Sequence, residues 1–141
     1  MVKPENLLQL NIYDKIFQDK LLIIGSCIPR LYPNVFKKFE KKWGNVVSVC
    51  MEQTHYNQIF SKVIDILALG QTQKVGFLTV DRSPHCVQLH YMSKYLKKAL
   101  KVTDIEYSHF VISEDKTVTE VTMEQINDSR NFSKIGKKYK K

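Results

Sequence analysis

Short apolar runs alternate with longer amphipathic segments along this chain. Runs that are continuous and rich in branched side chains predict strands buried on both faces; they cover residues 21–27, 45–50, 74–80 and 105–112. Between these runs, apolar residues recur at the spacing of one helix face; these segments cover residues 33–43, 54–69 and 83–100. The pattern therefore predicts a strand followed by a helix, three times, and then a fourth strand.

The two ends of the chain add further elements. Pro4 suits the first turn of a helix, and apolar residues then recur at four-residue spacing, so residues 4–18 are predicted to be helical. After the fourth strand, a polar turn at residues 114–116 and a β-branched run at 117–121 predict a hairpin. A last helix is predicted over residues 122–132.

Strands joined by crossover helices run parallel to one another. The predicted fold is therefore an α/β three-layer sandwich with a mostly parallel sheet of four to five strands and a C-terminal β-hairpin. A strand order that begins 2-1-3 is the usual one for this pattern, and 1-2-3 is the alternative.

The chain has 141 residues, of which 43% are hydrophobic, and this is enough for one ordinary packed domain. We expect a single domain over residues 1–133 and a basic tail over 134–141, whose five lysines supply much of the net charge of +8. No apolar run is long enough to cross a membrane. The N-terminus also lacks the apolar block of a secretory signal, so a cytoplasmic location is expected.

The three cysteines occupy comparable places in the pattern. Cys27 closes the first predicted strand, Cys50 ends the second, and Cys86 lies in the first turn of the helix after the third. Carboxyl ends of neighbouring parallel strands lie at one edge of a sheet, which is where ligands bind in open α/β folds. We therefore expect the three thiols at one edge, converging on a metal centre.

The width of that edge favours a cluster over a single ion. Zinc draws its thiolates to within about 4 Å of one another, because each Zn–S bond is about 2.3 Å. Three neighbouring strands span about 10 Å. A [4Fe–4S] cluster fits this span more easily than zinc does, and thiolates are its usual ligands. Three cysteines leave one iron for a histidine, a carboxylate, water or a substrate.

Other residues near the same predicted edge carry polar or titratable groups. The N-terminus of a helix beside Cys86 favours a thiolate there. His90 lies four residues after Cys86 and so shares its helix face. The predicted pocket is lined by Arg30, His55, Asp81, Arg82, Ser83, His85 and His90. His109 falls in the middle of the fourth strand and is predicted to be a core or face residue.

The favoured function is a small iron–sulfur protein with a redox, sulfur-handling or sensing role and a small-molecule or redox partner. Three alternatives remain open. The cysteines can be purely structural, because free cysteine packs well in a core. One cysteine can be the nucleophile of a thiol enzyme, with His85, His90 or His55 as its base. The chain can also bind a nucleotide or, through its basic tail, nucleic acid. A homodimer through the exposed hairpin edge is a further expectation.

Overall fold

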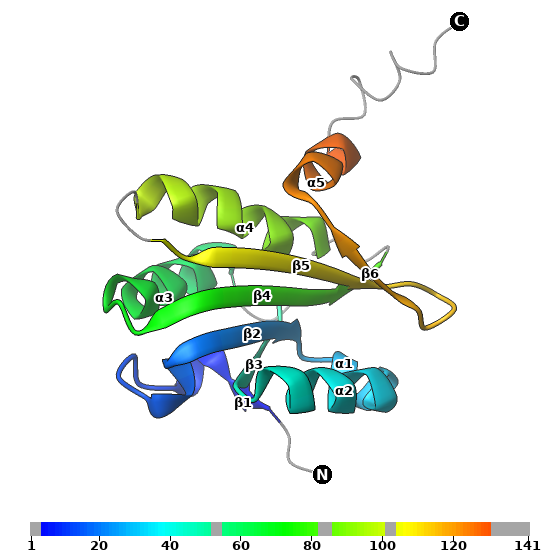
Figure 1. Ribbon diagram of the computed structural model, residues 1–141, viewed down its shortest axis with the longest axis horizontal. Helices are drawn as coiled ribbons and strands as arrows, with labels where there is room; N and C mark the ends of the chain where they lie inside the picture. Colours follow the sequence, from blue (N-terminus) through cyan, green and yellow to red (C-terminus); the bar gives the residue numbers. More distant parts are fainter. Residues whose placement is uncertain (1–3, 52–54, 82–85, 101–103, 131–141) are drawn as a thin grey trace, which may run out of the picture.

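The computed structural model describes residues 4–51, 55–81, 86–100 and 104–130, except for the side chains of Cys86 and of residues 128–130 (Figure 1). Its strands are β1 (Glu5–Asn6), β2 (Asp19–Gly25), β3 (Val46–Val49), β4 (Thr72–Val80), β5 (Glu106–Ile112) and β6 (Val118–Val121). Its helices are α1 (Ile28–Leu31), α2 (Pro33–Trp43), α3 (Tyr56–Ala68), α4 (Cys86–Ala99) and α5 (Met123–Arg130), with two 3₁₀ helices, η1 (Leu7–Gln9) and η2 (Lys15–Phe17).

The strands form one six-stranded sheet in the order β1-β3-β2-β4-β5-β6. The first five strands in this order are parallel to their neighbours, and β6 is antiparallel to β5. The predicted α/β class, the mostly parallel sheet, the order 2-1-3 and the C-terminal hairpin are confirmed. The sheet has six strands rather than four to five, because the short β1 pairs with β3.

The predicted helix over residues 4–18 is wrong. This segment contains β1, η1 and η2 instead. The side chains of Asn6 and Asp14 accept hydrogen bonds from the backbone N–H of Leu8 and Ile16, at 3.0 Å each. Such local bonds compete with a continuous helix. The apolar residues at four-residue spacing, Leu8, Ile12 and Ile16, are partly buried and pack against the core without forming a continuous helix.

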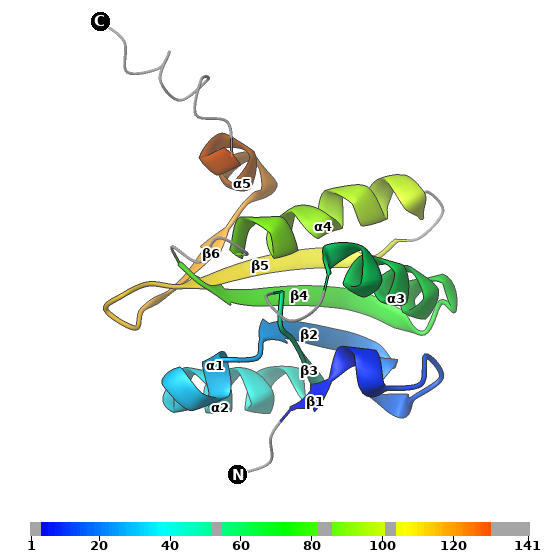
Figure 2. The same ribbon diagram turned by 180° about the vertical axis from the view of Figure 1, so that it is seen from behind.

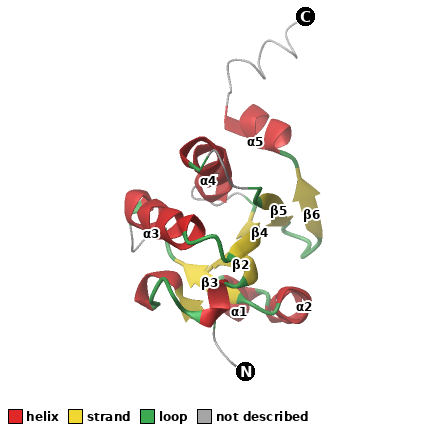
Figure 3. Cartoon of the chain, turned by 60° about the vertical axis from the view of Figure 1, so that its left-hand side comes forward, coloured by secondary structure: helices red, strands yellow, loops and turns green. Residues whose placement is uncertain are grey.

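Helices cover both faces of the sheet (Figures 2 and 3). On one face, α3 and α4 pack over a cluster built on Leu21, Ile23 and Phe77. On the other face, α2 packs over a second cluster, which contains Leu22 and Leu78. This alternation along β2 and β4 is why their apolar runs are continuous. Among the described helices, none combines the length and apolarity needed to cross a bilayer.

Candidate functional site

The carboxyl ends of β3, β2 and β4 lie side by side at one edge of the sheet (Figure 1). Gly25, the last residue of β2, pairs with Val49, the last residue of β3. The backbone N–H of Ser26, the next residue, donates to the carbonyl of Val49 at 2.9 Å. The segments that follow β2 and β3 therefore leave the sheet side by side. The residues that follow these strands therefore start from neighbouring positions.

Each of the three cysteines follows one of these strands. Cys27 is the N-cap residue of α1 and its side chain is exposed, whereas Cys50 directly follows β3 and is half-buried; both are free thiols. Cys86 is the first residue of α4, the helix that follows β4, but its side chain lies outside the described part. Within the described residues, no three histidine, cysteine or acidic side chains form a metal-binding group.

Three of the predicted pocket residues lie near this edge and are exposed. Arg30 belongs to α1, His55 is the N-cap residue of α3, and Asp81 directly follows β4. The backbone N–H of Asp81 donates to the carbonyl of Ile112 at 2.9 Å, which ties the end of β4 to the end of β5. Arg82, Ser83 and His85 lie outside the described residues.

His90, another of the predicted pocket residues, lies in the interior of the molecule. It is only 1% exposed, because its face of α4 packs on the sheet. Its Nε2 lies 2.8 Å from Oγ1 of Thr79, and its Nδ1 lies 3.0 Å from Nδ1 of His109 on β5. His90 therefore belongs to a buried histidine pair. One feature of the sequence could have indicated this pair: one histidine lies in a predicted strand, and another lies in the predicted helix that precedes it.

One arrangement of protons, with both rings neutral, satisfies the hydrogen bonds around the pair. Ser93 donates its one hydroxyl proton to the carbonyl of His90 at 3.2 Å, so it accepts from Nε2 of His109, also at 3.2 Å. A neutral His109 then accepts at Nδ1 from the Nδ1–H of His90. Nε2 of His90 in turn accepts from the hydroxyl of Thr79. Because Nδ1 of His90 faces Nδ1 of His109, only one of these two atoms can carry a proton, so the pair cannot hold two imidazolium rings.

The surroundings keep the pair neutral. Burial, with the neighbouring His109 as the second cause, lowers the pKa of His90 from 6.5 to about 3. Burial also lowers the pKa of His109 from 6.5 to about 4, with the charge of Lys97 as the second cause. The ring of Phe77 stacks on His109 with centroids 5.5 Å apart and adds an apolar wall. Both histidines are therefore uncharged at neutral pH.

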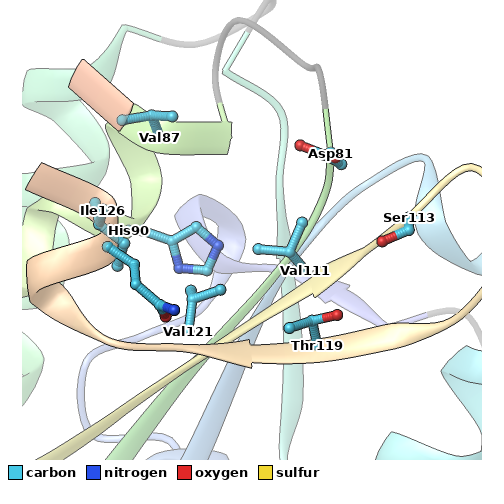
Figure 4. A pocket seen from close by; sticks show the side chains of 9 residues that line it. Asp81, Val87, His90, Val111, Ser113, Thr119, Val121 and Ile126 are labelled. Carbon is cyan, nitrogen blue, oxygen red and sulfur yellow. The ribbon is translucent and has the colours of Figure 1, made fainter. Parts of the chain in front are cut away.

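A cavity of about 290 Å³ lies beside His90, between α4, the hairpin and α5 (Figure 4). Its walls combine aliphatic side chains with the polar tips of a few others; the lining residues are Asp81, Val87, His90, Val111, Ser113, Thr119, Val121, Gln125 and Ile126. A mostly apolar molecule of small size fits such a space. Asp81 and His90, two of the predicted pocket residues, both line this cavity, whereas the sequence did not indicate its other walls, which form where β6 and α5 fold back toward α4.

Comparison with known proteins identifies a family for this chain. A family model described as a Rossmann-like domain matches residues 15–141 of the chain. No curated protein and no solved structure matches it.

Proposed function

The chain belongs to the family of Rossmann-like domains, and from that premise we propose that its carboxyl edge binds an iron–sulfur cluster through Cys27, Cys50 and Cys86. One observation supports the proposal above all: the strands that precede these residues, β2, β3 and β4, are neighbours in one parallel sheet. Sheets of this kind present their ligand sites at the carboxyl ends of the strands.

The spacing of the three strands suits a cluster. Adjacent strands lie about 4.8 Å apart, so the outer two, β3 and β4, are about 10 Å apart across β2. A [4Fe–4S] cluster bridges such a gap with less distortion of the loops than a single zinc ion, whose thiolates must crowd together. Cys86 begins α4, where the helix dipole favours a negatively charged sulfur.

Exposure of the edge suits chemistry with a partner from solution. Cys27 is exposed and Cys50 is half-buried, so a cluster held there is reached from solvent. Three thiolates leave one iron of a four-iron cluster for another ligand. His55 and Asp81 are exposed groups near the same edge that are able to act as that ligand. Electron transfer, sulfur handling and sensing all fit such a centre.

Anaerobic reconstitution with iron and sulfide tests this proposal. A bound [4Fe–4S] cluster gives about four irons and four sulfides per chain, with broad absorbance in the visible range. We expect Cys27→Ala, Cys50→Ala and Cys86→Ala each to lose most of the iron, because each removes a thiolate ligand. Ser26→Ala, an exposed change next to Cys27, serves as the matched control and keeps the full iron content.

Other outcomes of the same experiments would contradict the proposal. A colourless wild-type chain that retains less than about one iron after reconstitution contradicts the proposal. Equal iron in wild type and in all three alanine variants contradicts it as well, because the metal is then held elsewhere. Alkylation of one cysteine far faster than the other two, in a chain without iron, favours a thiol enzyme instead.

A further inference from the structure

Four aromatic side chains form a continuous row across α3 and α4, the two helices that lie side by side on one face of the sheet (Figure 2). Tyr56 stacks on Phe60 within α3, with ring centroids 5.9 Å apart and an angle of 13° between the rings. Phe60 meets Tyr95 of α4 edge-on at 6.3 Å, and Tyr95 lies 5.4 Å from Tyr91. We call these four residues the aromatic ladder.

Tyr95 is the most open member of the ladder. Its side chain is 41% exposed, although a tyrosine on the outside of a helix usually gains by burial. Phe60 contacts it from the neighbouring helix and Tyr91 from the preceding turn, so its ring is held on two sides. A ring held in this way loses little side-chain entropy when a flat ligand stacks on it.

Two lysines lie near Tyr95 on α4. Lys94 donates to the hydroxyl of Tyr91 at 3.0 Å, and its Nζ lies 4.9 Å from the centre of that ring. Lys98 is exposed and follows Tyr95 by three residues, which places it on the same side of the helix. Residues 56–68 and 86–99 together contain four lysines and one aspartate, a balance of +3, within a chain of net charge +8.

An exposed flat ring with lysines nearby matches one class of partner. Single-stranded nucleic acid offers unpaired bases that stack on aromatic rings and phosphates that bind lysines. In a duplex the base faces are stacked on one another and are not available to an aromatic side chain. An apolar peptide carries no negative charge that would bind the lysines. We propose that the aromatic ladder, with Lys94 and Lys98, binds single-stranded nucleic acid. Tyr95 supplies the stacking platform, and the two lysines contact the phosphates on either side of it.

Fluorescence anisotropy with a labelled oligothymidylate of about 12 nucleotides, at about 50 mM salt, tests the proposal on the full chain. We expect Tyr95→Ala to weaken binding by about fivefold or more, since each stacked base contributes that much. Tyr95→Trp keeps the platform and keeps the affinity. Tyr13→Ala is the control, because Tyr13 is 67% exposed and lies outside the ladder, so it leaves the affinity unchanged.

Salt dependence separates stacking from charge. Lys98→Ala should reduce the slope of log affinity against log salt by about 0.7, whereas Tyr95→Ala lowers the affinity and leaves the slope unchanged. If Tyr95→Ala binds as tightly as the wild type, the ladder is not the platform and the proposal is wrong. Absence of wild-type binding at about 50 mM salt overturns it as well.

Discussion

Acidification from pH 7 toward pH 4 should destabilise the fold steeply through the buried pair of His90 and His109. Both pKa values lie below the ordinary 6.5 in the folded chain, at about 3 and about 4, so the unfolded chain binds more protons below pH 6.5. The contribution of the pair to the free energy of unfolding is therefore fully present above pH 6.5, and it is lost as the pH drops toward the two folded-state pKa values. Each histidine contributes up to about 1.4 kcal/mol per pH unit in this window.

Urea unfolding at a series of pH values measures this effect. His109→Gln removes one titrating ring while keeping a polar side chain, so the pH slope of its unfolding free energy should fall by up to about 1.4 kcal/mol per unit. Its stability at pH 7 also drops by about 1–3 kcal/mol, because hydrogen bonds inside the core are lost. Ser26→Ala, an exposed change without a titrating group, is the control and keeps the wild-type slope. Identical slopes for wild type and His109→Gln between pH 6.5 and 4 would show that the pair does not resist protonation.

Gly76→Ala should cost about 1–3 kcal/mol of stability through steric overlap in the middle of β4. A Cβ at this position would lie 2.6 Å and 2.7 Å from two ring atoms of Trp43 and 3.0 Å from Leu22. Trp43 has little room to move, because it is 3% exposed and meets Phe110 edge-on at 6.3 Å. The close approach of the indole ring therefore requires glycine in this strand.

Thermal or urea unfolding of Gly76→Ala and of three further variants tests this expectation. In Gly25→Ala the new Cβ meets nothing closer than 3.8 Å, so this control should stay within about 0.5 kcal/mol of wild type. Trp43→Leu removes the obstructing ring, and adding Gly76→Ala to that variant should cost much less than it does in wild type. An equal cost of Gly76→Ala in both backgrounds would mean that the indole ring is not the obstacle.

Much of the sheet could be predicted from local pattern. Continuous apolar runs identify β2, β3 and β4, because strands covered by helices on both faces have no polar side. Gly44 and Gly70 follow α2 and α3 closely and adopt positive φ, at 78° and 76°, a conformation that favours glycine and ends a helix. The segment before β2 was predicted wrongly, since hydrogen bonds from Asn6 and Asp14 outweigh its helical spacing.

Only the part of the candidate site that follows from the order of the strands could be predicted from the sequence. Consecutive parallel strands bring Cys27 and Cys50 to neighbouring positions, and a pattern of strands and helices contains that information. The role of His90 was not predictable in the same way. Whether a helix residue faces solvent or the sheet depends on how α4 packs over β5, and the contact with His109 arises only from that packing.

X-ray absorption at the iron edge, on the anaerobically reconstituted chain, tests thiolate ligation at the sheet edge most directly. Thiolate ligation predicts a first shell dominated by sulfur together with iron–iron scattering, both of which disappear when Cys27, Cys50 and Cys86 are replaced by alanine. A first shell of oxygen and nitrogen, or a sulfur shell that survives the loss of these cysteines, would contradict it.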